Sequence, residues 1–275
     1  MTDAPIRPDW RAVMPWPEPD AHKHSRGRLG VVSGRAGQTG AARLAARGGL
    51  RIGAGVVSLL CPVEAVAVLA PAVEAVMLKP FAAPEVLAEL AEAMDAVVVG
   101  PAAGLNDATL ANVHALAATG TAMVIDADGL TVFEGWPADL FALLDRDDVL
   151  TPHEGEFRRL FPDLLAKGRK PAATEAAARA GCVVVLKGPQ TVIAAPDGRI
   201  VVNDNGTPWL ATAGSGDVLA GMIGGLVAQR MDSFDAACAA VWIHAEAAAG
   251  FGAGLIAEDL PDRIPAVLAR LWPGH

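Results

Sequence analysis

The segment Thr212–Asp217 combines two glycines, a serine and an aspartate in a pattern that could bind and transfer a phosphate group. An apolar run typical of a helix follows it, so Asp217 would lie at a helix N-terminus. The first N–H groups of a helix lack intrahelical acceptors and can bind an anion. The N–H groups of this anion hole would belong to Gly214, Ser215 and Gly216. Asp217 could take a proton from a hydroxyl that attacks the phosphate, or Ser215 or Asp217 could merely cap the helix.

A second candidate for phosphate contact is the segment Lys187–Thr191, which follows a buried apolar run. Its lysine could neutralise phosphate charge, and its threonine could hydrogen-bond a phosphate oxygen. The alternative interpretation is a surface turn.

His153 and Glu156 are spaced i, i+3 at the expected start of a helix, so they would share one face. They could hold a ligand or a metal together, and a paired helix cap is the alternative. No third His, Cys or Asp nearby completes a zinc site, which argues against a structural metal.

Four other polar residues have weaker signals. Asp126 and Asp128 follow a buried strand and could contact Mg²⁺ or a ribose, or could simply cap a turn. His244 and Glu246 lie in an alanine-rich run, and we interpret them as packing and solvated residues.

Two common nucleotide-binding signatures are absent from the sequence. No G-x-x-x-x-G-K-[ST] segment occurs, which excludes a Walker A loop. Gly34, Gly37 and Gly40 have a G-x-x-G-x-x-G spacing, and the next strand ends in Cys61-Pro62 rather than in an acid. A Rossmann dehydrogenase is therefore disfavoured. The loop 34–40 either contacts a ligand or forms a tight strand-to-helix turn.

The elements that must position these residues follow from short apolar runs alternating with helical patterns. We expect strands at 28–33, 56–60, 96–99, 122–125, 148–150 and 182–186, and a hairpin of 191–193 with 199–202. We expect helices at 41–50, 63–70, 84–94, 107–118, 154–161, 172–180, 218–223, 236–250 and 261–271.

This alternation predicts an α/β fold with a mostly parallel central sheet covered by helices on both faces. Ligands bind at the carboxyl ends of the strands in such sheets. The loops expected at that edge are 34–40, 100–104, 126–128, 151–153, 187–188 and 214–217. We expect residues 1–275 to form a single domain, with 1–24 as an irregular N-terminal arm lying on it.

Composition narrows the class of protein. Hydrophobic residues make up 52% and charged residues 19% of the 275 residues, which allows a large core. The formal net charge of -9 disfavours a nucleic-acid or anionic-membrane binder. Cys61, Cys182 and Cys238 form no CxxC pattern, and no signal peptide or membrane span is evident. We therefore expect a cytoplasmic protein with reduced cysteines.

The order of the motifs is more specific than any one of them. The motifs lie, in order, at 22–30, 34–42, 51–55, 99–104, 124–130, 150–157, 186–191 and 211–221. Together they resemble the ADP/ATP-dependent NAD(P)H-hydrate dehydratases, a branch of the ribokinase-like superfamily. The resemblance covers roughly residues 22–250 and implies a ribokinase-like three-layer sandwich.

The resemblance implies nicotinamide cofactor repair. The ring hydroxyl of the (6S) hydrate of NADH or NADPH would be phosphorylated by ADP or ATP with Mg²⁺, and phosphate would then leave. Asp217 would be the catalytic base, and Ala41, Gly104, His153 and Asp217 would contact the hydrate. Lys187, Gly188, Pro189, Gln190, Thr191 and Gly216 would bind the nucleotide. Glu156 would order the metal through water. A homotetramer is also implied, and an epimerase domain is expected to be absent.

The sequence departs from the family pattern at three places. Ala102 replaces a glycine of the usual Gly-Pro-Gly-Leu-Gly loop, and Ala213 replaces one in Thr-Gly-Gly-Thr-Gly-Asp. Asn205–Pro208 replaces a typical Thr-Gly-Asn-Pro segment. Two alternatives stay open: a ribokinase-like small-molecule kinase for a thiazole, pyrimidine or pyridoxal substrate, and a nucleotide-binding regulatory module without turnover.

Overall fold

The computed structural model describes residues 10–274, which contain one sheet of nine strands. The strands are β1 (Arg28–Val32), β2 (Val56–Pro62), β3 (Met77–Phe81), β4 (Ala96–Val99), β5 (Met123–Ile125), β6 (Val149–Leu150), β7 (Val183–Leu186), β8 (Thr191–Ala194) and β9 (Ile200–Asn203). Their order is β3-β2-β1-β4-β5-β6-β7-β8-β9. Neighbours from β3 to β7 are parallel, and β8 and β9 form an antiparallel hairpin on that sheet. The mostly parallel sheet expected from the sequence is confirmed.

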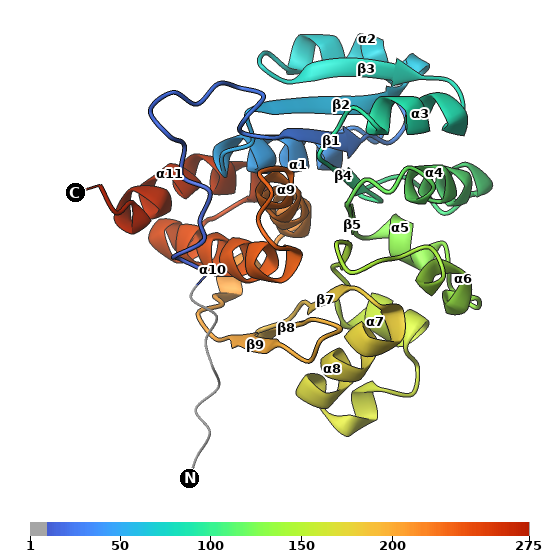
Figure 1. Ribbon diagram of the computed structural model, residues 1–275, viewed down its shortest axis with the longest axis vertical. Helices are drawn as coiled ribbons and strands as arrows, with labels where there is room; N and C mark the ends of the chain where they lie inside the picture. Colours follow the sequence, from blue (N-terminus) through green and yellow to red (C-terminus); the bar gives the residue numbers. More distant parts are fainter. Residues whose placement is uncertain (1–9, 275) are drawn as a thin grey trace.

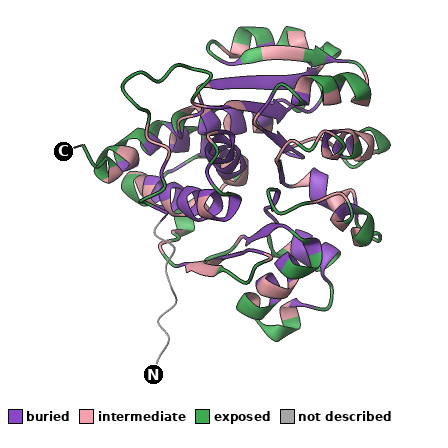
Figure 2. Cartoon of the chain, viewed as in Figure 1, coloured by how far each residue is buried: buried purple, intermediate pink, exposed green. Residues whose placement is uncertain are grey.

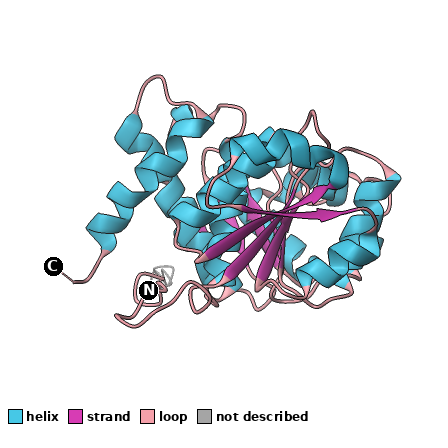
Figure 3. Ribbon diagram, turned by 90° about the horizontal axis from the view of Figure 1, so that it is seen from above, coloured by secondary structure: helices cyan, strands magenta, loops and turns pink. Residues whose placement is uncertain are grey.

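Helices cover both faces of the twisted sheet (Figures 1 and 3). The α-helices are α1 (Gly40–Arg51), α2 (Val66–Leu69), α3 (Pro84–Ala91), α4 (Asp107–Ala117), α5 (Asp128–Thr131), α6 (Pro137–Phe141), α7 (Glu154–Leu160), α8 (Arg169–Ala180), α9 (Ser215–Ala228), α10 (Ser233–Phe251) and α11 (Leu260–Leu271). Helices α1, α2, α9, α10 and α11 pack on one face, and α3 to α8 pack on the other. Successive strand residues alternate between the two cores: Val31 contributes to the first and Val32 to the second. Burial of strands on both faces explains their wholly apolar sequences.

The close packing of α9 on α1 fixes where the N-terminus of α9 lies. A Cβ at Gly221 would lie 1.9 Å from the carbonyl oxygen of Ala45, and a Cβ at Gly48 would lie 2.6 Å from that of Val218. These glycines therefore let the two backbones touch. Every residue from Val218 to Ala228 is buried, as the purple core of Figure 2 shows. The rigid core of the molecule thus holds the segment that carries Asp217.

The expected strands and longer helices are present, with three differences. The edge strand β3 was missed because it contains Pro80 and is only partly buried, a combination that sheets tolerate at an edge. The short helices α5 and α6 were not expected either. The region 63–72 is one turn of α-helix flanked by two 3₁₀ segments rather than a continuous helix.

The N-terminal arm is irregular from residue 10 to residue 24, as expected, and residues 1–9 lie outside the described part. Trp10 and Met14 are buried, and the Trp10 ring lies 5.5 Å from that of Trp242 on α10. The arm therefore packs on the domain. Among residues 10–274, every helix is too short or too polar to span a bilayer. All three cysteines are buried and free of disulfides.

Candidate functional site

An ion pair lies at the carboxyl ends of β5 and β7. Lys187 follows β7, Asp126 follows β5, and Lys187 Nζ donates to Asp126 Oδ1 at 2.6 Å. The Asp126 side chain is only 2% exposed and that of Lys187 is 19% exposed. Lys187 thus offsets the charge of a buried carboxylate, and its remaining two protons can meet a ligand.

The N-terminus of α9 lies beside this pair. A Cβ at Gly216 would lie 3.5 Å from Lys187 Nζ and 3.8 Å from Asp126 Oδ2. The N–H groups of Gly216 and Asp217 have no hydrogen-bond acceptor within residues 10–274. An anion bound by these N–H groups would therefore also face the lysine ammonium.

The N-cap of α9 is neither Ser215 nor Asp217. Gly214 is the N-cap, with φ +88°, and no side chain accepts a hydrogen bond there. Ser215 Oγ instead donates to the carbonyl oxygen of Leu210 at 2.8 Å. The interpretation of Ser215 or Asp217 as a cap was wrong, because a glycine in the left-handed region already turns the chain into the helix. Among residues 10–274, no backbone N–H donates to the Asp217 carboxylate.

Electrostatics favour Asp217 as a base near neutral pH. Its pKa is raised from the ordinary 3.8 to about 6: burial is the largest cause, the charges of Asp126 and, less strongly, Asp128 also raise it, and Lys187 lowers it. A carboxylate with this pKa is ionised at pH 7 and still basic enough to accept a proton from a hydroxyl. Perturbed carboxyl groups of this kind cluster at functional sites.

His153 and Glu156 form the helix cap that was considered as the alternative to ligand binding. His153 Nδ1 accepts from the N–H of Gly155 at 2.9 Å, and the N–H of His153 donates to Glu156 Oε2 at 2.7 Å. The Glu156 carboxyl is buried, and burial raises its pKa, while Lys187 lowers it. Glu156 Oε1 lies 3.3 Å from His153 Nε2 and accepts no other hydrogen bond from residues 10–274. The imidazole itself is 56% exposed and can reach a ligand.

No metal site is complete in the protein alone. Among residues 10–274, no three His, Cys, Asp or Glu side chains converge as metal ligands. Glu156 Oε1 accepts no backbone hydrogen bond from the described residues and could accept one from a metal-bound water, and Mg²⁺ commonly retains several waters beside one or two carboxylates and substrate phosphates. The donor set therefore fits a Mg²⁺ ion that arrives with a nucleotide.

The loop 100–104 is joined to Asp128 by a hydrogen bond. The N–H of Gly104 donates to Asp128 Oδ2 at 2.8 Å, and Gly104 has φ +88°. A Cβ at Gly34 would lie 2.2 Å from the carbonyl oxygen of Ala102, so the loops 34–40 and 100–104 are in contact. Ala41 is half-buried in the first turn of α1. Asp128 thus links Gly104 to the surroundings of Asp217.

Ala102 has a backbone conformation that favours glycine. Its φ is +53°, in the left-handed region that L-residues other than glycine avoid. The alanine therefore adds strain at this position, on the order of 1 kcal/mol.

A cavity of about 530 Å³ lies between the β8–β9 hairpin, the 204–211 loop and helices α9 and α10. Its lining includes five residues for which the sequence predicts nucleotide binding: Lys187, Gly188, Pro189, Thr191 and Gly216. Gln190 is not among the lining residues, and its carbonyl oxygen accepts from Arg169 Nη2 at 3.3 Å. Gln190 is therefore the one nucleotide-binding candidate of Lys187–Thr191 that does not line this cavity.

Two supporting residues were missed by sequence reasoning. Arg169 Nη2 donates to the carbonyl oxygens of Leu186 at 2.9 Å and Lys187 at 3.0 Å, which holds the loop before Gln190 in place. His244 Nε2 lies 3.0 Å from the carbonyl oxygen of Ser215, and burial lowers its pKa to about 4. The neutral imidazole therefore donates to the first turn of α9. The sequence did contain a signal for His244, because it is a polar residue on an otherwise apolar helix face.

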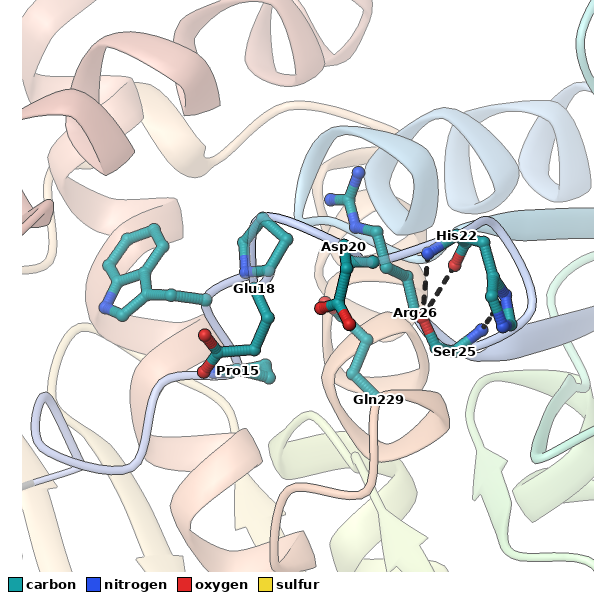
Figure 4. A pocket seen from close by; sticks show the side chains of 10 residues that line it. Pro15, Glu18, Asp20, His22, Ser25, Arg26 and Gln229 are labelled. Carbon is teal, nitrogen blue, oxygen red and sulfur yellow. Dashed lines mark hydrogen bonds between the residues drawn. The ribbon is translucent and has the colours of Figure 1, made fainter.

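A separate cavity of about 360 Å³ lies under the N-terminal arm, between residues 15–26 and Gln229 (Figure 4). Ser25 Oγ donates to the carbonyl oxygen of His22 at 2.8 Å in the turn that borders it. Gln229 follows the C-terminal end of α9, roughly 18 Å along the helix from Asp217. This cavity is therefore not part of the site.

The motif at 22–30 has a structural explanation. A Cβ at Gly27, which has φ +81°, would lie 2.1 Å from the carbonyl oxygen of Ala228, and a Cβ at Gly55 would lie 2.0 Å from that of Lys23. These two glycines let the backbone of residues 23–27 lie against the end of α9 and against the residue before β2.

Comparison with known proteins places the chain in a family. A family model described as NAD(P)H-hydrate dehydratase matches residues 29–269. The chain belongs to the NAD(P)H-hydrate dehydratase family. It is 36% identical over 264 residues to the ADP-dependent (S)-NAD(P)H-hydrate dehydratase of Neisseria meningitidis, covering 88% of this chain and 84% of that protein.

Other dehydratase-family comparisons agree. The bifunctional NAD(P)H-hydrate repair enzyme Nnr of Salinibacter ruber is 40% identical over 287 residues, covering 98% of this chain. The chain spans about half (52%) of that relative's length. The Bacillus subtilis ADP/ATP-dependent NAD(P)H-hydrate dehydratase, co-crystallised with ATP/Mg²⁺, superposes with a TM-score of 0.82 at 27% identity, covering 99% of this chain and 100% of that one. The ribokinase-like fold is confirmed.

Proposed function

We propose that the protein repairs hydrated nicotinamide cofactors. The reaction is the ADP- or ATP-dependent dehydration of the (6S) hydrate of NADH or NADPH, and AMP or ADP is released. The observation that carries the proposal is the position of Asp217: a carboxylate with a pKa of about 6 beside unpaired helix N–H groups and the Lys187–Asp126 pair. Family membership and the ADP-dependent relative of Neisseria meningitidis support the choice of substrate.

In the first step Asp217 accepts the proton of the ring hydroxyl. The hydroxyl oxygen attacks the terminal phosphorus of the nucleotide, and the bond from that phosphorus to the bridging oxygen breaks. AMP leaves if ADP is used, and ADP leaves if ATP is used. In the second step phosphate departs from the ring with loss of a ring proton, which restores the C=C bond of NAD(P)H. Asp217 thus supplies the base for a kinase-like step.

The transferring phosphoryl group is held by the N–H groups at the start of α9. Gly216 and Asp217 would donate to its oxygens, while Lys187 neutralises charge that develops toward the leaving nucleotide. Lys187 need not move far to do so, since a Cβ at Gly216 would be 3.5 Å from its Nζ. The hydrate would lie on the side of Asp217 away from the nucleotide, in contact with His153, Gly104 and Ala41.

A Mg²⁺ ion bound with the nucleotide would neutralise phosphate charge, with Glu156 holding it through water. Glu156 is suited to this because, among residues 10–274, only the His153 ring pairs with its Oε1. The buried Asp126, already paired with Lys187, adds negative charge on the same side.

We further propose a single cytoplasmic domain that assembles as a homotetramer. Sedimentation or light scattering of the pure protein tests the assembly: a mass four times that of the chain supports it, and a stable monomer contradicts it.

The proposed function is tested by mixing pure protein with NADH hydrate, Mg²⁺ and either ADP or ATP, and following the absorbance of NADH. Recovery of NADH that requires a nucleotide and releases phosphate is expected. Phosphorylation of a thiazole, pyrimidine or pyridoxal alcohol without any NADH recovery would indicate a small-molecule kinase instead. Nucleotide binding without turnover of any of these substrates would indicate a regulatory module.

A further inference from the structure

We propose that Asn205 is a positioning residue for the nucleotide: its side chain holds the segment 204–207 against α10, beside the cavity of about 530 Å³. We call this cavity the nucleotide cavity. The inference rests on the proposed function, because it concerns how ADP or ATP is bound there. Asn205 begins one of the segments in which the sequence departs from the family pattern. Asn205 does not line the nucleotide cavity itself, whereas its neighbours Asn203, Gly206 and Thr207 do.

The side-chain amide of Asn205 bridges the cavity wall and α10. Asn205 Nδ2 donates to the carbonyl oxygen of Trp242 at 3.2 Å and to Glu246 Oε1 at 3.1 Å. These two acceptors are spaced i, i+4 and therefore share one face of α10. Asn205 Oδ1 accepts from Asn203 Nδ2 at 2.6 Å, and Asn203 is a buried residue of the cavity wall. Every polar atom of the Asn205 side chain thus has a partner.

The segment 204–206 depends on this side chain for its attachment. Among residues 10–274, no backbone–backbone hydrogen bond involves residues 204–206. The segment also touches the Lys187–Thr191 loop, because a Cβ at Gly206 would lie 2.7 Å from the carbonyl oxygen of Pro189. Removal of the Asn205 side chain would therefore release a segment that packs against the proposed nucleotide-binding loop.

The Glu246 carboxylate is itself held in place for Asn205. Glu246 Oε2 accepts from Arg270 Nη2 of α11 at 2.9 Å, while Oε1 faces Asn205. The Glu246 side chain is 26% exposed and that of Arg270 is 62% exposed. An exposed ion pair contributes little by itself, whereas a hydrogen bond to a carboxylate is stronger than one between neutral groups. The bond from Asn205 to Glu246 is therefore the main attachment, and Arg270 orients the carboxylate.

A segment that is already in its binding conformation lowers the cost of binding the nucleotide. When only a fraction of the molecules has the segment in place, the apparent Kd rises by the inverse of that fraction. Asp217 belongs to α9, which the buried core holds independently of this segment. Loss of Asn205 should therefore weaken nucleotide binding without changing the chemical step.

The test measures the Kd for ADP and for ATP by calorimetry. Asn205→Ala and Glu246→Ala should each raise this Kd about tenfold, the loss of one hydrogen bond to a charged group. In the NADH recovery assay, KM for the nucleotide should rise by the same factor, while kcat at saturating nucleotide and KM for NADH hydrate stay unchanged. The double variant should bind no more weakly than Asn205→Ala alone, because both changes remove the same hydrogen bond.

Two further variants serve as controls. Glu246→Gln keeps an acceptor oxygen for Asn205 and loses only the ion pair with Arg270, so its Kd should stay within about threefold of wild type. Glu175→Ala removes a carboxylate of α8 that is likewise paired with an arginine but does not line the nucleotide cavity. Its Kd should equal that of wild type.

Each result decides the inference. Weaker nucleotide binding in both Asn205→Ala and Glu246→Ala, without further loss in the double variant, supports it. An unchanged Kd in Asn205→Ala, an equal rise of KM for NADH hydrate, additive effects in the double variant, or a Glu246→Gln variant as weak as Glu246→Ala overturns it. The calorimetry requires no turnover. A wild-type protein that binds the nucleotide but restores no NADH would overturn the proposed function, and the Kd values would still decide the role of Asn205.

Discussion

Replacing Asp217 by asparagine should stabilise the protein at neutral pH while removing its activity. The buried carboxyl has a pKa of about 6 in the folded protein, against an ordinary value of 3.8. The folded state therefore holds the proton more tightly than the unfolded chain. Between about pH 4 and pH 6 the unfolded chain releases this proton first, so the free energy of unfolding falls as pH rises through this window. Asparagine carries no proton to lose and avoids this cost.

The size of the effect follows from the pKa difference. At 1.36 kcal/mol for each pKa unit, the change from 3.8 to about 6 corresponds to about 3 kcal/mol. Asp217 keeps partial access to solvent, so we discount this to about 1–2 kcal/mol. For a chain of this length that is roughly 2–8 °C in Tm.

The assay is thermal unfolding of wild type and Asp217→Asn at pH 8 and at pH 4. The variant should melt higher at pH 8, and the difference should disappear at pH 4. Glu89→Gln, an exposed carboxylate-to-amide change on α3, serves as the control and should not alter Tm at either pH. A variant that is no more stable than wild type at pH 8, or a difference that does not depend on pH, would refute the electrostatic reasoning.

Three further predictions concern other parts of the site. Lys187→Ala should weaken nucleotide binding about 10–100-fold in calorimetry and hydrate binding much less, since a charged hydrogen bond to phosphate is lost; equal effects would place Lys187 elsewhere. Gly221→Ala should lower the free energy of unfolding by about 1–3 kcal/mol or more, because its methyl would collide with Ala45, whereas Gly37→Ala, which faces open space, should be neutral in denaturant titrations. Ala102→Gly should raise stability by about 0.5 kcal/mol, the relief of strain exceeding the entropy of glycine; a loss of stability would argue against strain at this residue.

The sheet and its loops could be predicted because most strands are apolar and each of the expected loops contains glycine, proline or aspartate. Strand β3 could not, since Pro80 and its exposed edge position hide the pattern. The cap of α9 was misassigned because sequence alone does not reveal that Gly214 adopts φ +88°.

The ion pair between Lys187 and Asp126 could not be predicted from the sequence either. Lys187 and Asp126 are 61 residues apart, and only the parallel crossovers bring the ends of β5 and β7 together. His244 was interpreted as packing, and it is buried, but its hydrogen bond to Ser215 depends on how α10 packs on α9. Local sequence patterns predict helices and strands. Contacts between residues that follow different strands can be predicted only when the order of the strands in the sheet is known.

The measurement that tests the central claim most directly is the rate of NADH recovery from NADH hydrate, followed from pH 5 to pH 8 with ADP or ATP. For wild type we expect kcat/KM to rise as pH passes about 6, where Asp217 becomes ionised, and then to level off. Asp217→Asn should be slower by ~10²–10⁴-fold at every pH while it still binds the nucleotide. Near-normal recovery by Asp217→Asn, or a wild-type rate that does not change across this range, would contradict the role of Asp217 as the base.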